Sequence, residues 1–100
     1  MTNKRLELHN ILLGICPNVY FQPPENLKLQ YPCIIYRRAN GNTLFADNLP
    51  FRFYTRYTLT CIDKDPDSEI IDKIAALPMC TLDRHFTFEN LNHDVFNIHY

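Results

Sequence analysis

The sequence has few glycines and no long apolar run. Only two of its 100 residues are glycine, against seven prolines, which favours defined turns over flexible linkers. No stretch approaches the roughly 20 apolar residues that a membrane-spanning helix needs. The apolar run after Lys4 and Arg5 is broken by polar residues, which argues against a signal peptide. We therefore expect a cytoplasmic protein whose cysteines are reduced.

The sequence also lacks an excess of charge and a cluster of metal ligands. Ten basic and eleven acidic residues give a formal net charge of −1, which provides no overall field for nucleic acid or an anionic membrane. The four cysteines and four histidines are scattered, without Cys-x-x-Cys or His-x-x-x-His, so we predict neither a metal nor a cofactor. Cys33, Cys61 and Cys80 fall in predicted strands, where a buried thiol acts as a small apolar side chain.

The acidic and histidine pairs do not make a recognisable catalytic site. Asp83-Arg84-His85 and His93-Asp94 have the composition of acid–base pairs, but no Gly-x-Ser-x-Gly turn or comparable nucleophile accompanies them. The acidic run from Asp63 to Glu69 lacks the glycine and the closing glutamate of a calcium loop, and helix capping explains it more simply. We therefore predict that the protein is not an enzyme.

Residues 51–62 predict a long β-strand with two unlike sides, because their side chains alternate with a period of two. One side carries Phe51, Phe53, Tyr57, Leu59 and Cys61. The other side carries Arg52, Tyr54, Arg56, Thr58 and Thr60. We assign the first side to the core. Arginine and tyrosine are enriched at protein interfaces, so we assign the second side to a partner.

The rest of the chain predicts two helices and four further strands. One helix covers residues 2–15, and the other begins with Asp65 as N-cap and Pro66 as first helical residue. The strands are expected at residues 19–21, 33–38, 80–88 and 94–100, and residues 39–50 are expected to form a long loop. The order α-β-β-β-α-β-β predicts an α+β fold, a mostly antiparallel central sheet flanked by two helices, in a single domain of residues 1–100.

Two finer expectations follow from the same patterns. The first helix should bury one row of side chains, and the second helix another. These rows are Leu8, Ile11, Leu12 and Ile15, and Ile70, Ile71, Ile74 and Leu77. The last strand carries neither proline nor lysine, so we expect it to be an open sheet edge that is used in assembly.

Four short strings in the second part of the chain occur together. They are Tyr31-Pro32 before Ile34-Ile35-Tyr36; Ala46-Asp47-Asn48; Asp63-Lys64-Asp65-Pro66-Asp67-Ser68 with Leu77-Pro78; and Phe86 followed by Asn90-Leu91-Asn92-His93-Asp94. In combination they resemble the tail completion (tail terminator) proteins of long-tailed bacteriophages. The resemblance covers about residues 31–100.

The resemblance implies a structural virion protein with a central sheet flanked by helices. Such a protein is assembled in the host cytoplasm and forms a hexameric ring at the head-proximal end of the tail. The ring ends polymerisation of the tail tube and forms the joint to the head connector or head completion protein. Its partners are further copies of the chain, the tail tube protein and the connector. Binding to a membrane or to a specific nucleic-acid sequence is not implied, although DNA can pass through the ring.

We predict seven residues in contact with a neighbouring subunit or partner. They are Asp47, Asn48, Arg52, Tyr54, Arg56, His93 and Asp94. The alternative is a small single-strand nucleic-acid-binding or regulatory module that uses the same face of the sheet, since arginine and tyrosine side chains can stack on bases.

Overall fold

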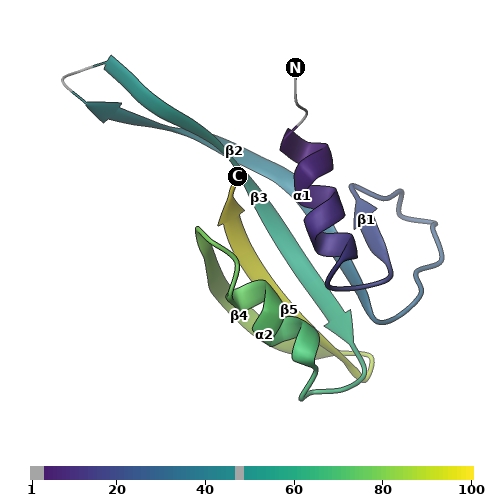
Figure 1. Cartoon of the computed structure of the whole chain (residues 1–100). Coiled ribbons are helices and arrows are strands. Elements are labelled where there is room, and N and C mark those ends of the chain that lie inside the picture. Colours follow the sequence, from purple (N-terminus) through teal and green to yellow (C-terminus); the bar gives the residue numbers. More distant parts are fainter. Residues whose placement is uncertain (1–3, 47–48) are drawn as a thin grey trace.

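The chain folds into the predicted order of helices and strands (Figure 1). The computed structural model describes residues 4–46 and 49–100, and for residues 40–46 and 49–55 it describes the backbone alone. The elements are α1 (Lys4–Leu13), β1 (Val19–Phe21), β2 (Cys33–Ala46), β3 (Leu49–Asp63), α2 (Glu69–Ala75), β4 (Cys80–Phe88) and β5 (Leu91–His99). The predicted α+β class is therefore confirmed.

The five strands form one mixed sheet in the order β1-β2-β3-β5-β4. β1 and β2 are parallel, and the other three neighbouring pairs are antiparallel. β5 is inserted between β3 and β4, so the expectation that the last strand forms an open edge is wrong. The β4–β5 hairpin folds back onto β3, and it leaves β4 at the edge instead.

The predicted loop at residues 39–50 is also wrong, because β2 continues to Ala46 and β3 begins at Leu49. The pairing of β2 with β3 shifts register between Arg38 and Gly41, and this irregularity interrupts the alternation by which a strand is recognised. β5 pairs with β3 only from Arg56 onward. Beyond that point β2 and β3 continue as a two-stranded ribbon that extends away from the sheet (Figure 1). We call residues 40–46 and 49–55 the arm.

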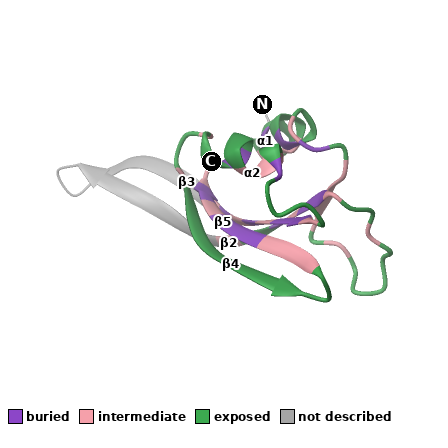
Figure 2. Ribbon diagram, turned by 90° about the horizontal axis from the view of Figure 1, so that it is seen from below, coloured by how far each residue is buried: buried purple, intermediate pink, exposed green. Residues whose placement is uncertain are grey.

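Both helices pack on the same face of the sheet (Figure 2). The core beneath them is formed by buried side chains from the helices, the segment after α1 and the three central strands. These are Leu8, Leu12, Cys16, Ile34, Tyr36, Tyr57, Leu59, Cys61, Ile74, Phe96 and Ile98. The row predicted for α2 is confirmed, with Ile74 buried and the other three members partly buried. Within the described residues, neither helix is long and apolar enough to cross a membrane.

α1 buries a narrower face than its sequence predicts. Leu8 and Leu12 are buried and Ile15 is partly buried, but Ile11 is 40% exposed. Tyr36 of β2 fixes the helix from below, since its hydroxyl lies 2.7 Å from Nδ1 of His9. Residues 2 and 3 of the predicted helix lie outside the described residues.

α2 begins later than predicted, because Ser68 is its N-cap rather than Asp65. The Ser68 hydroxyl accepts a hydrogen bond from the Ile70 backbone N–H at 3.3 Å. The carboxylates of Asp63 and Asp65 instead accept bonds from the backbone N–H two residues further on, at 3.0 and 2.9 Å. Such local bonds are typical of Asx turns. The acidic run is thus a turn that leads into a serine-capped helix.

The β4–β5 hairpin is tighter than expected. β4 ends at Phe88 and β5 begins at Leu91, so the connection is Glu89-Asn90 rather than residues 89–93. Both connecting residues have positive φ, 52° and 64°, which two-residue type I′ turns require. The early start of β5 places His93 and Asp94 within a strand and not in a turn.

Candidate functional site

The sheet has two unlike faces, as the alternation along β3 predicts. Tyr57, Leu59 and Cys61 are buried beneath the helices, whereas Arg56 and Thr58 are partly exposed on the opposite side. We call that opposite side, which carries neither helix, the open face (Figure 2). Strand alternation and register place many described residues there, of which ten are used below. They are Arg37, Arg56, Thr58, Thr60, Arg84, Phe86, Phe88, His93, Val95 and Asn97.

The open face is cationic although the whole chain is slightly acidic. The ten residues include three arginines and no carboxylate, against a formal net charge of −1 for the protein. Arg56 has a buried Nε atom without a hydrogen-bond partner in the described part of the chain. An unsatisfied buried donor is unfavourable for the folded chain. The Arg56 side chain as a whole is partly exposed on the open face, which is compatible with the predicted contact.

Aromatic rings lie at the β4 side of the open face. The rings of Phe86 and His93, which are paired across β4 and β5, stack at 4.7 Å between centroids and 14° between planes. The Arg84 guanidinium lies 5.9 Å from the Phe86 ring centroid. Phe86 and Phe88 are 40% and 62% exposed. This cluster can contact an apolar or aromatic partner group, and cation–π contact with Arg84 adds to it.

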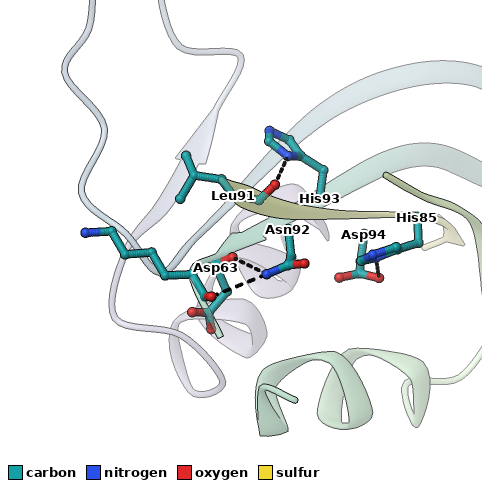
Figure 3. A network of polar contacts seen from close by, with 7 residues as sticks. Asp63, His85, Leu91, Asn92, His93 and Asp94 are labelled. Atoms are coloured by element: carbon teal, nitrogen blue, oxygen red, sulfur yellow. Dashed lines mark hydrogen bonds and ion pairs between the residues drawn. The ribbon is translucent and has the colours of Figure 1, made fainter. Parts of the chain in front are cut away.

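Two side chains of β5 fix the hairpin to its surroundings (Figure 3). The Nδ1–H of His93 donates to the Leu91 carbonyl oxygen at 3.1 Å, since a carbonyl can only accept. The Asn92 side-chain amide donates to the carbonyl oxygens of Asp63 and Lys64, both at 3.3 Å. The ring of His93 is therefore oriented within the open face, and β5 is tied to the end of β3.

Asp94 pairs with His85 on the helix-covered face (Figure 3). Nδ1 of His85 lies 2.7 Å from Oδ1 of Asp94, which is 5% exposed. Oδ2 of Asp94 is buried and has no hydrogen-bond partner among the described residues. A carboxylate that orients an imidazole is one part of acid–base catalysis, but catalysis also needs a substrate pocket. We therefore assign the pair a structural role.

A cavity lies elsewhere, between α1, the segment that follows α2, and the end of β5. It has a volume of about 520 Å³ and is lined by Leu8, Ile11, Leu77, Met79 and Tyr100 among others. The Tyr100 hydroxyl donates to the Glu7 carboxylate across it at 3.4 Å. Neither His85 nor Asp94 lines this cavity.

The cysteines behave as apolar side chains. Cys16, Cys33 and Cys61 are buried and Cys80 is partly buried, all as free thiols. The prediction of buried thiols in strands is therefore confirmed for Cys33 and Cys61, and Cys80 is only partly buried. Burial raises the pKa of the Cys33 and Cys61 thiols to about 12. In the described residues no three His, Cys, Asp or Glu side chains are grouped so that they could hold a metal ion.

The seven predicted contact residues do not form one cluster. Arg56 and His93 share the open face, whereas Asp94 lies buried on the other face. Arg52 and Tyr54 belong to the arm, of which only the backbone is described, and Asp47 and Asn48 lie outside the described residues.

Arg84 and Phe88 are on the open face but are not among the seven contact residues predicted from the sequence. The alternation Arg84-x-Phe86-x-Phe88 is a signal in the sequence that could have identified this row.

Comparison with known proteins adds no relative to this description. No family model matches the chain. No curated protein and no solved structure matches it either. The resemblance to phage tail terminator proteins therefore depends on the four sequence strings.

Proposed function

We propose that this protein is a structural virion component that caps the tail tube of a long-tailed bacteriophage as a ring of six copies. The ring ends tube polymerisation and joins the tube to the head connector or head completion protein. The proposal places the protein at the head-proximal end of the tail after assembly in the host cytoplasm, and it assigns no catalytic activity. It starts from the four sequence strings within residues 31–100.

The arm is the observation that best supports an assembly role. β2 and β3 have 14 and 15 residues, whereas strands in globular proteins usually have about five or six. Residues 49–55 of β3 lie beyond the reach of β5 and pair with β2. A two-stranded ribbon alone is at best marginally stable in water. Contact with another subunit would stabilise it, which favours a chain that works as part of an assembly.

The open face supplies the second part of the proposed contact surface. Arg56 lies at the junction of the arm and the sheet, and its buried Nε lacks a partner in the described residues. We propose contacts by Arg52 and Tyr54 of the arm and by Arg56 at its base, together with Asp47 and Asn48, which lie outside the described residues. His93 completes the proposed set on the open face. Asp94 is buried and holds β4 and β5 together through His85, so it supports the surface without touching a partner.

The proposal is tested by electron microscopy of tails and by an Arg56→Glu variant. A six-fold ring of this protein at one end of purified tails is expected. The variant should fold normally but fail to join heads to tails, because a carboxylate replaces a guanidinium at the contact. Lys28→Glu, at an exposed loop position, makes the same charge change as a control and should leave joining intact. Tails that lack this protein would contradict the proposal.

A second candidate, a single-strand nucleic-acid-binding module, is favoured by one observation. The stacked Phe86 and His93 rings next to Arg84 offer a cationic, aromatic surface of the kind on which bases stack. This function predicts oligonucleotide binding that weakens steeply with salt. The measurement is fluorescence anisotropy with a labelled oligonucleotide at low ionic strength, and complete absence of binding there eliminates the candidate.

A further inference from the structure

β4 presents one unpaired edge of the sheet. It is the last strand in the order β1-β2-β3-β5-β4, and its described pairing is with β5 alone. Residues 81–88 are all exposed. The register with β5 shifts between Leu82 and Arg84, so the regular part of the edge is residues 84–88. Unpaired backbone groups on such an edge are available to another strand.

Apart from the register shift and the charges of Asp83 and Arg84, the edge has few of the features that usually prevent pairing. Exposed edge strands are commonly protected by proline, by lysine or by being very short. β4 has nine residues without proline or lysine, and its Leu82 and Phe88 side chains are 57% and 62% exposed. Burial of these apolar groups would favour association.

A second unpaired edge belongs to the arm. β3 pairs with β5 from Arg56 to Asp63, so the side of β3 that β5 occupies is free along residues 49–55 of the described backbone. Pro50 has no N–H to donate, and the pairing with β2 skips Phe51 at a register shift, which leaves Arg52–Thr55 as the regular part of this edge. This stretch of four residues is close in length to the five regular residues of β4.

We propose that residues 84–88 of β4 in one copy pair with residues 52–55 of β3 in the next copy, so that the sheet continues from subunit to subunit. The inference deepens the proposed ring and rests on it. Each copy supplies one β4 edge and one arm, which makes the contact head-to-tail. Contacts of this kind close into a ring when the rotation between copies permits it.

Both segments are rich in aromatic and β-branched residue types, which favour strand pairing. The arm segment has the sequence Arg-Phe-Tyr-Thr, and the β4 segment has Arg-His-Phe-Thr-Phe. Aromatic pairs across neighbouring strands stabilise a sheet by roughly 0.2–1 kcal/mol each. Two further edges remain in the described backbone. β1 has only three residues and is too short to replace either segment. The outer side of β2 pairs with β1 at residues 34–36 and is unpaired along the arm.

Cross-linking between two different variants tests the pairing. All proteins carry Cys80→Ser, which removes the native thiol that is not fully buried. One protein carries Arg52→Cys in the arm, and the others carry Phe86→Cys, Thr87→Cys or Phe88→Cys in β4. Disulfide-linked dimers are expected in the mixtures and not in the separate samples. Side chains alternate between the two faces of a strand, so residue 87 points to the opposite face from residues 86 and 88. The yield of disulfide-linked dimer with Thr87→Cys should therefore differ by at least about fivefold from the yields with Phe86→Cys and Phe88→Cys.

A blocking variant gives an independent measurement. Thr87→Lys introduces a charge on the edge strand and should weaken self-association at least about tenfold in sedimentation experiments, because lysine on an edge opposes strand addition. Asn26→Lys, at an exposed loop position, adds the same charge as a control and should not change association. Circular dichroism checks that both variants are folded.

The outcomes separate this inference from the proposed function. A six-fold ring on tails without arm-to-β4 cross-links overturns the strand pairing but leaves the proposed function standing. Dimers that form mainly in the unmixed samples indicate symmetric pairing and overturn the inference. A chain that stays monomeric and uncross-linked at millimolar concentration also overturns it, and tails without any ring contradict the proposed function itself.

Discussion

At the scale of single residues, the contact between His85 of β4 and Asp94 of β5 is the one that we expect to affect stability most. Asp94 is 5% exposed and its Oδ2 has no partner among the described residues, so His85 is the group that compensates its burial. Loss of the imidazole would leave a buried acceptor unsatisfied. The pair therefore contributes to stability although His85 belongs to the edge strand β4.

We expect His85→Ala to lower the free energy of unfolding by about 1–2 kcal/mol at neutral pH. This is the lower part of the range for an orphaned buried acceptor, because 48% of the His85 side chain is in solvent. Urea unfolding followed by circular dichroism measures the change. His85→Ala combined with Asp94→Asn should be less destabilised than the two single effects added together. Strict additivity would contradict the direct contact.

The buried thiols make stability depend on alkaline pH. Burial raises the pKa of Cys33 and Cys61 from 9.0 to about 12. Between these values the folded chain keeps protons that the unfolded chain loses, so stability falls as the pH rises through this window, by up to about 1.4 kcal/mol per pH unit for each thiol.

Urea unfolding at about pH 8 and about pH 10.5 measures this dependence. Cys33→Ala and Cys61→Ala should each reduce the loss of stability between the two pH values, because alanine does not titrate. If the original protein and both variants lose the same free energy of unfolding between the two pH values, burial does not raise the pKa of these thiols in the folded chain.

At the scale of elements, the start of α2 depends on one hydroxyl group. Ser68 is 8% exposed and accepts a hydrogen bond from the Ile70 N–H, whereas Asp65 belongs to the preceding turn. We expect Ser68→Ala to lower the free energy of unfolding by about 1 kcal/mol.

Ser68→Asp retains a side-chain oxygen and serves as the matched control, with a smaller expected loss in urea unfolding. Its added charge also lies at the favourable end of the helix dipole. If Ser68→Ala leaves stability unchanged while Asp65→Ala lowers it by a similar amount, the helix begins at Asp65 in solution, as the sequence predicts.

At the scale of the whole molecule, the arm is separable from the core. The principal extents are 49 × 25 × 23 Å, and the arm extends beyond the sheet body (Figure 1). Every member of the described core cluster lies outside residues 39–56. Arg38 and Tyr57 are a register pair, so a two-residue turn can join them directly.

We therefore expect a variant in which Asn-Gly replaces residues 39–56 to fold and to unfold cooperatively on heating, since the described core is retained. It should be monomeric and should not enter assemblies of the full-length chain. Circular dichroism and sedimentation measure the two properties. A variant that does not fold would show that the arm contributes to the core of its own subunit.

Local sequence patterns predicted the elements well. The alternation along residues 57–61 assigned Tyr57, Leu59 and Cys61 to the core, and the spacing in α2 identified Ile74 as buried. The loop prediction failed where the register shift between Arg38 and Gly41 breaks the alternation. The N-cap prediction failed because Asp-Pro is typical of a helix start but here lies in a turn stabilised by aspartate side chains.

The sequence by itself determined most of the helices and strands and the apolar side of the central ones, because these properties depend on residues a few positions apart. It did not determine the arm, where strands replace the predicted loop. Only the tertiary structure decided that β5 lies inside the sheet, that β4 is its edge, and that His85 faces Asp94. Strand order and pairing depend on contacts between distant segments, which the period of one strand does not encode. The phage tail role and its contact residues remain predictions from the sequence resemblance.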